Sequence, residues 1–190
     1  MVTKRDMLKA VLGGAVCAPG LAAAGGGPRA AYFPNTIVET QHGEKLRFYD
    51  DVVKGNKIVV FNMMYTLCTN ICPPGTANLM QVQKLLGERV GRDVFFYSLT
   101  LRPEVDTPQA LLAYAKQFGL NPGWKLLTGK PAEMDAIRRK LGFYDRDPVV
   151  DADLSQHTGM LRIGNEAYDR WKMMPALLTP RQLANSIMDM

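Results

Sequence analysis

The chain has 190 residues, of which 47% are hydrophobic, and this is enough for one domain with a sizeable core. Its net charge of +5 is only mildly basic, and its lysines and arginines do not gather in a stripe with interleaved aromatic residues. These features argue against nucleic acid as a partner.

The N-terminal 24 residues have the features of a signal peptide. A basic region at Lys4 and Arg5 precedes a short apolar run from Ala10 to Ala24 that ends in small residues. Residues 3–9 resemble a twin-arginine signal with lysine in place of the first arginine. The alternative is an uncleaved segment that tethers the protein to the membrane. In either case we expect an exported domain, in the periplasm or on the outer face of the cytoplasmic membrane.

A linker and a hairpin follow the export signal. Residues 25–35 are rich in glycine and contain two prolines, which predicts a linker. Apolar and polar residues then alternate over residues 36–49, with a turn at His42 and Gly43, and this pattern predicts a β-hairpin. A polar connection is expected over residues 50–56. We assign His42 no role beyond this turn.

The middle of the chain predicts strands that alternate with helices. Apolar runs predict buried strands at residues 57–63, 94–99 and 124–127. Apolar residues at three- and four-residue spacing predict helices at residues 74–89, 108–118 and 131–141. In front of the second helix, Asp106 is expected to be a helix-cap residue.

The C-terminal part completes the predicted architecture. Residues 144–156 are expected to form a polar loop, residues 160–171 a second hairpin, and residues from Thr179 onward a last helix. Strands that alternate with helices require parallel pairing and right-handed crossovers. The prediction is an α/β, thioredoxin-like fold over residues 36–190, with an N-terminal β-hairpin and a hairpin inserted in the C-terminal half.

Two cysteines stand at the turn between the first buried strand and its helix. Because Cys17 belongs to the export signal, Cys68 and Cys72 are the cysteines of the mature chain. A helix N-terminus offers free N–H groups and the positive end of the helix dipole, which both favour a thiolate. Outside the cytosol, such a pair forms a disulfide, a redox couple or a metal site. A purely structural disulfide is least favoured, because so short a loop constrains little of the unfolded chain.

The sequence around these cysteines resembles the signature of the Sco/SenC copper-chaperone family. The resemblance rests on residues 61–73, which read FNMMYTLCTNICP. Further matches follow in the expected order: residues 106–108 before a helix, Trp124 in the next strand, and His157 just ahead of the second hairpin. Together these matches cover residues 33–190.

Membership of this family implies a thioredoxin-like fold that binds copper through two cysteines and one histidine. Residue by residue, these ligands correspond to Cys68, Cys72 and His157. Family members help to assemble the dinuclear copper centre of cytochrome c oxidase. The resemblance therefore implies a monomeric metallochaperone, rather than an enzyme, whose partner is a cytochrome c oxidase subunit or another copper-site protein. Two positions depart from the family pattern: Thr69 stands where many members have proline, and Arg102 where many have aspartate.

The donor types are suitable for copper on chemical grounds. Thiolates are soft ligands that suit Cu(I), and imidazole also suits Cu(II). Three protein ligands leave an open edge through which a partner protein could take the ion. Zinc accepts the same donors, so the residues alone do not fix the metal. Asp151 and Asp153 precede His157 and are expected to be solvated loop acids, the alternative being that they orient the imidazole.

Two other functions would use the same cysteines. In a thiol–disulfide oxidoreductase, Cys68 or Cys72 attacks a disulfide and the other cysteine resolves the product. In a peroxidase-like protein, a thiolate near Arg102 attacks a peroxide. The metallochaperone is the favoured hypothesis, and His157 distinguishes it from the reductase, which has no strict need of an imidazole.

Overall fold

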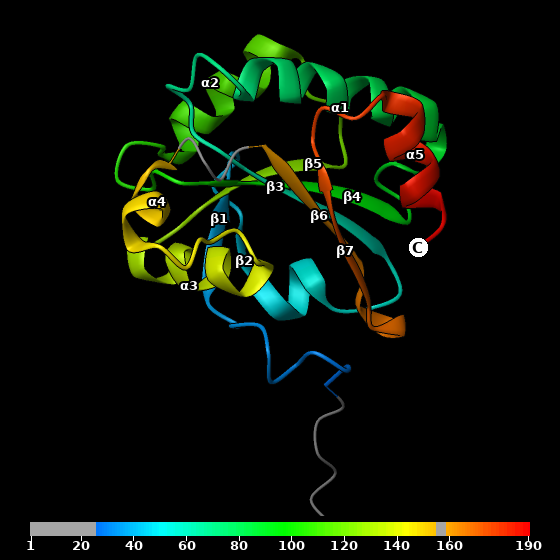
Figure 1. The fold of residues 1–190 in the computed structure, drawn as a ribbon, viewed down its shortest axis with the longest axis horizontal. Helices are drawn as coiled ribbons and strands as arrows, with labels where there is room; N and C mark the ends of the chain where they lie inside the picture. The colour runs from blue at the N-terminus through cyan, green and yellow to red at the C-terminus, as the bar shows by residue number, and fades with distance from the viewer. Residues whose placement is uncertain (1–25, 155–158) are drawn as a thin grey trace, which may run out of the picture.

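A mixed β-sheet forms the centre of the molecule (Figure 1). The computed structural model describes residues 26–154 and 159–190. Its strands are β1 (Ile37–Thr40), β2 (Lys45–Arg47), β3 (Ile58–Met64), β4 (Val94–Thr100), β5 (Trp124–Thr128), β6 (Met160–Asn165) and β7 (Arg170–Pro175). Within the described residues they form one seven-stranded sheet in the order β2-β1-β5-β4-β3-β6-β7.

The three central strands are parallel and carry the cysteines at one end. β3 pairs with β4 and β4 with β5 in parallel, whereas β6 runs antiparallel to β3. The crossovers are made by α1 (Cys72–Leu86) and α2 (Pro108–Phe118). The predicted α/β, thioredoxin-like fold is therefore confirmed, including the β1–β2 and β6–β7 hairpins.

Helices cover both faces of the sheet, and each face buries its own apolar cluster. In Figure 1, α1, α2 and α5 (Pro180–Met188) lie above the sheet. The π-helix η1 (Phe48–Val53) and α3 (Pro131–Leu141) lie below it, whereas α4 (Pro148–Ala152) lies at the left. Cys68 and Cys72 belong to the cluster under α1, together with Met64, whereas Met63 belongs to the opposite cluster. Short 3-10 turns follow α1 at Gly87–Arg89 and β6 at Glu166–Tyr168.

Most helix ends follow the predicted turn chemistry, with one exception. The side chain of Thr107 caps α2, and Thr179 forms a capping box at the start of α5. Gly119 and Gly142 adopt left-handed conformations directly after α2 and α3. The prediction that Asp106 is a cap residue is wrong, because Thr107 is the cap and Asp106 is buried.

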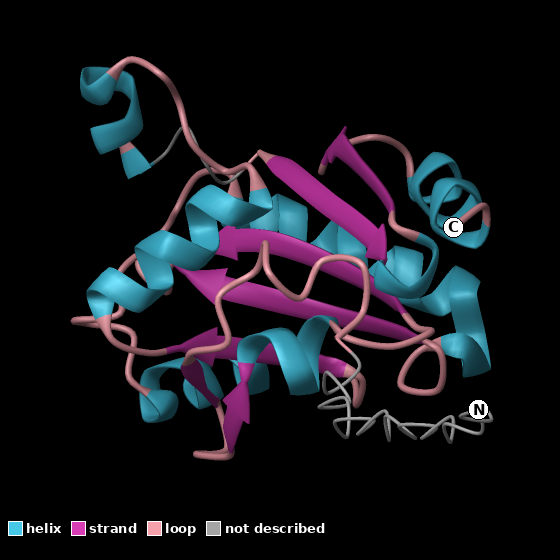
Figure 2. Ribbon diagram, turned by 90° about the horizontal axis from the view of Figure 1, so that it is seen from below, coloured by secondary structure: helices cyan, strands magenta, loops and turns pink. Residues whose placement is uncertain are grey.

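Two segments that were predicted to be irregular form helices. Residues 144–156 were expected to be a loop, but Pro148–Ala152 form α4, which Figure 2 shows at the upper left, set apart from the sheet. The predicted connection after the first hairpin is largely η1, and Phe48 and Tyr49 are buried in it rather than lying in a strand. Finally, α1 begins at Cys72, before its predicted start at residue 74.

The segment ahead of β1 packs against the domain. The backbone N–H of Arg29 and the hydroxyl of Tyr49 both donate to the buried carboxylate of Glu166, at 3.0 and 2.8 Å. Arg29 also forms an ion pair with Asp169, and Phe33 is buried. Part of the expected linker is thus fixed to the 3-10 turn after β6. Among the described residues, no helix combines the length and apolarity needed to cross a membrane.

Candidate metal centre

The two cysteines lie where β3 passes into α1. β3 ends at Met64, the cysteine loop (residues 65–71) follows, and Cys72 is the first residue of α1. The next two residues are Pro73 and Pro74, which have no N–H to donate. The free donors of this helix start are therefore few, and the backbone N–H groups of Cys72 and Asn70 point to the sulfur of Cys68.

The two thiols are unbridged, buried and in contact with each other. Both cysteines are free, with 7% and 5% of their surface exposed for Cys68 and Cys72. Burial opposes ionisation of Cys68, but hydrogen bonds from the Cys72 thiol and from the two backbone N–H groups outweigh it and lower its pKa. Burial and the hydrogen bond to Cys68 raise the pKa of Cys72. The pair thus ionises first at Cys68, and Cys72 keeps its proton.

Tyr65 and Arg102 complete the polar surroundings of Cys68. The Tyr65 hydroxyl donates to Cys68, and burial together with this hydrogen bond raises the pKa of Tyr65. The positive charge of Arg102 partly opposes this effect by lowering the pKa of Tyr65. Arg102 is half-buried and lies 3.5 Å from a carboxylate oxygen of Glu104. Arg102, which stands where many family members have aspartate, is thus near enough to influence the Tyr65 hydroxyl that donates to Cys68.

Asp106 ties the cysteine loop to the end of β4. Its carboxylate accepts the backbone N–H of Thr66 at 3.2 Å, as well as the hydroxyls of Thr66 and Thr100. The negative charge of Asp106 also contributes to the raised pKa of Cys72. Sequence reasoning missed this role, because an aspartate next to a threonine and a proline is equally typical of a helix start.

The predicted third ligand, His157, lies outside the described residues. Of the described residues on either side of it, Gly159 lies against the cysteine loop and Leu154 lies near the end of β4. Leu154 lines a small cavity of about 140 Å³ together with Thr100, whose hydroxyl contacts Asp106. A Cβ atom added to Gly159 would lie 3.5 Å from the Cδ1 atom of Ile71. Within residues 26–154 and 159–190, no group of three or more His, Cys, Asp or Glu side chains is arranged to hold a metal.

The two aspartates ahead of His157 in the sequence have different surroundings. Asp151 is not a solvated loop acid, because it is buried and paired with Arg138 and Arg139. Asp153 is exposed and has an interaction partner. His42 is exposed beside the β1–β2 turn, as predicted.

Comparison with known proteins places this site in a family. The SCO1/SenC family matches residues 39–190. A SCO2-like protein of Rickettsia conorii is 30% identical over 128 residues, which is 64% of this chain and 60% of that protein. The matched stretch thus spans less than two thirds of this relative.

Two solved structures have the same fold. ScoI of Bradyrhizobium japonicum, solved with copper bound, has a TM-score of 0.62 and 21% identity, and the match covers 80% of this chain and 95% of that chain. BsSco, described as a member of the Sco family of cytochrome c oxidase assembly proteins, has a TM-score of 0.64 and 21% identity over 81% of this chain and 90% of that chain. Because the family match extends over most of the chain, from β1 to the C-terminus, the protein belongs to the SCO1/SenC family.

Proposed function

We propose that this protein is a copper metallochaperone that binds copper through Cys68, Cys72 and His157. It delivers the ion for assembly of the dinuclear copper centre of cytochrome c oxidase. The main support is the pair of buried, unbridged thiols in mutual hydrogen-bond contact at the start of α1. The copper-bound ScoI relative and the assembly role stated for BsSco agree with this proposal.

The position of the chain around residue 157 supports the third ligand. Gly159 lies against Ile71, the residue directly before Cys72, and Leu154 lies near Thr100 at the end of β4. Two residues span at most about 7 Å, so connectivity allows an imidazole at position 157 to reach the thiols. Two sulfurs and one nitrogen suit both Cu(I) and Cu(II).

The unequal thiols suit an ion that must be taken up and released. Four hydrogen-bond donors lower the pKa of Cys68, whereas the pKa of Cys72 is raised and Cys72 becomes a ligand only when its proton leaves. Metal binding therefore releases a proton, and acid favours loss of the ion. A partner with its own thiolates could replace Cys72 first and Cys68 last.

The chain offers a matched pair of histidines for the test. Reduced protein is titrated with Cu(I) in competition with a chromophoric chelator, without oxygen. Since even an outer-shell partner is worth about 10–100-fold in metal affinity, we expect His157→Ala to weaken binding by at least about tenfold. His42→Ala should bind like the wild type, because His42 is exposed beside the β1–β2 turn. Equal affinities of both variants and the wild type would exclude His157 as a ligand.

A thiol–disulfide oxidoreductase is the second candidate, and the lowered pKa of Cys68 favours it. The Cys68 thiolate would attack a partner's disulfide, form a mixed disulfide and release one partner thiolate, which takes up a proton. Cys72 would then lose its proton and attack Cys68, which forms the Cys68–Cys72 disulfide and releases the second thiol. Two electrons pass to the partner. Reduced protein that binds one equivalent of Cu(I) and loses its reactivity to alkylation favours the chaperone, whereas thiols that stay reactive favour the reductase.

We also propose that the protein works outside the cytosol as a monomer. The features of residues 1–24 support export, and either cleavage or a tether would leave the domain in the periplasm or on the outer face of the cytoplasmic membrane. Its partner would be a copper-site protein, in the first place a cytochrome c oxidase subunit.

A further inference from the structure

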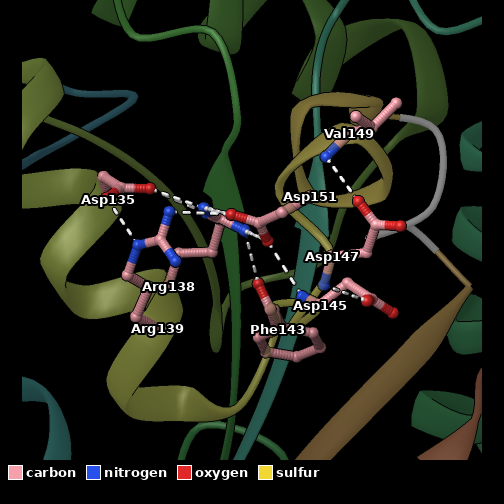
Figure 3. Close-up of polar contacts among 8 residues, drawn as sticks. All are labelled: Asp135, Arg138, Arg139, Phe143, Asp145, Asp147, Val149 and Asp151. Atoms are coloured by element: carbon pink, nitrogen blue, oxygen red, sulfur yellow. Dashed lines mark hydrogen bonds and ion pairs between the residues drawn. The ribbon is translucent and has the colours of Figure 1, made fainter.

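A cluster of ion pairs joins α3 to α4, away from the thiols. Figure 3 shows the guanidinium of Arg138 between the carboxylates of Asp135 and Asp151, with Arg139 beside them. Arg138 and Asp151 are both buried, with 8% of each side chain exposed. Charged residues this buried are uncommon unless they are paired, as these two are.

The contact between Arg138 and Asp151 is bidentate. Nη1 of Arg138 donates to Oδ1 of Asp151 at 2.8 Å, and Nη2 donates to Oδ2 at 2.9 Å. Arg138 also donates to Asp135 and to the carbonyl oxygen of Phe143. Arg139 adds a bond of 2.7 Å to Asp151. Two parallel bonds to a planar guanidinium fix the orientation of the carboxylate as well as its distance.

The same carboxylate fixes the start of α4. The backbone N–H of Asp145 donates to Asp151 at 2.9 Å, and the Asp147 side chain caps α4 by accepting the N–H of Val149. These bonds hold Arg138, the turn at residues 143–147 and α4 together. Because α4 has only five residues, its own hydrogen bonds would not keep it helical in water.

α4 also ends five residues before His157 in the sequence. Leu154, two residues after α4, lines a cavity together with Arg138 and Thr100. Thr100 ends β4 and pairs with Met64, after which the cysteine loop begins. The hydrogen bonds of Asp151 therefore restrain the chain six residues before the proposed ligand.

We propose that Asp151, clamped by Arg138 and Arg139, is a positioning residue that fixes the start of the segment carrying His157 and thereby sets the affinity for copper. The inference rests on the proposed function, because it acts through His157. A buried ion pair adds little net stability compared with apolar packing, but it specifies one geometry. The clamp reduces the conformational entropy that the segment loses when the imidazole binds the ion. Removing the clamp therefore weakens copper binding although every donor atom is kept.

A double-mutant cycle tests this role. Asp151→Asn keeps the size of the side chain and removes its charge. We expect it to lower Cu(I) affinity by about tenfold, the lower end of the effect of outer-shell partners. In the His157→Ala background the same change should alter affinity by less than about twofold, because the two residues act as a unit. Equal losses in both backgrounds would overturn the clamp and leave a purely structural role.

Two controls keep the test decisive. Asp93→Asn breaks another aspartate–arginine contact, with Arg89 at 2.8 Å, at the end of β4 opposite Thr100, and should leave affinity unchanged. If Asp151→Asn fails to fold, Arg139→Gln removes the exposed arm of the cluster, and a smaller loss of affinity that again depends on His157 is expected.

A second readout needs no metal. In the metal-free protein, Asp151→Asn should speed amide hydrogen exchange in a peptide covering residues 152–160 more than Asp93→Asn does, and equal exchange would count against the clamp.

If His157→Ala binds copper like the wild type, both the ligand set and the clamp fail. If His157→Ala weakens copper binding but Asp151→Asn leaves the affinity unchanged, the clamp alone fails.

Discussion

Two cysteines that look equivalent in the sequence are chemically different in the fold. Cys68 receives hydrogen bonds from Cys72, Asn70 and Tyr65, whereas Cys72 is the donor in their shared contact. The sequence predicted the position of the pair, since a strand followed by a helix start is readable from apolar runs and prolines. It did not predict which thiol ionises first, because that depends on how the cysteine loop turns its N–H groups.

The order of ionisation gives a prediction at the residue scale. Cys72→Ala removes the thiol donor from Cys68, so the pKa of Cys68 should rise. The rate of alkylation of Cys68 in metal-free protein, followed against pH by mass spectrometry, should then reach its plateau at a higher pH than in the wild type. A profile that does not move, or moves toward acid, would mean that Cys72 does not stabilise the Cys68 thiolate.

Single aspartates were the least predictable residues of the candidate site. Asp106 and Asp151 have ordinary positions in the sequence, before a helix and in a polar stretch. Their roles come from distant partners: Asp106 binds Thr66, 40 residues away in the sequence, and Asp151 binds Arg138, 13 residues away. Sequence patterns report local spacing, so tertiary partners of this kind are not visible in them.

At the scale of elements, the parts with strong local signals were predicted well. The central strands are continuous apolar runs, and α2, α3 and α5 begin at prolines that follow a cap position. The missed elements are α4 and η1, which have only five and six residues. Their stability comes from contacts with other elements, such as the Arg138 cluster, and not from their own apolar periodicity.

The attachment of α4 should depend on pH in a defined direction. Arg138 holds the pKa of Asp151 well below its usual value, against the opposing effect of burial. A carboxylate whose pKa is lower in the folded than in the unfolded protein stabilises the fold at pH values above its unfolded pKa of ~3.9. This stabilisation is lost as the pH falls toward the folded-state pKa. Because Asp151→Asn leaves Arg138 buried with one partner fewer, we expect it to cost about 3–5 kcal/mol of unfolding free energy at neutral pH.

Urea unfolding at several pH values measures this difference. The gap between the wild type and Asp151→Asn should narrow below pH ~4, where the wild-type carboxylate begins to lose its advantage. A gap that stays constant down to the lowest pH at which both proteins fold would show that the charge of Asp151 is not what stabilises α4.

At the scale of the whole molecule, the sheet separates the thiols from the N-terminal attachment. β3 leads into the cysteine loop at its carboxyl end, whereas its first residue, Ile58, pairs with Asn165. Glu166 follows directly and holds Arg29 and Tyr49. The chain therefore enters the domain at the end opposite the thiols, and a tether at the N-terminus would leave the cysteine loop facing away from it.

This separation predicts that the N-terminal attachment can be loosened without loss of metal binding. Glu166→Ala removes the acceptor of two hydrogen bonds, which costs about 1–3 kcal/mol for the buried donors left behind. Gly27→Ala acts on the same contact, because its Cβ would overlap a carboxylate oxygen of Glu166. Trypsin should cleave after Arg29 faster in both variants. Copper affinity should stay within about twofold of wild type, since Glu166 lies beside the end of β3 opposite the thiols. A large loss of affinity would show that the two ends are coupled.

X-ray absorption spectroscopy of the copper-loaded, signal-less protein tests the central claim most directly. The spectrum should fit one copper ion with two sulfur neighbours and one imidazole nitrogen, and the nitrogen should be missing in His157→Ala but present in His42→Ala. A spectrum without sulfur neighbours, or one that is identical in wild type and His157→Ala, would contradict the assignment of Cys68, Cys72 and His157 as the copper ligands.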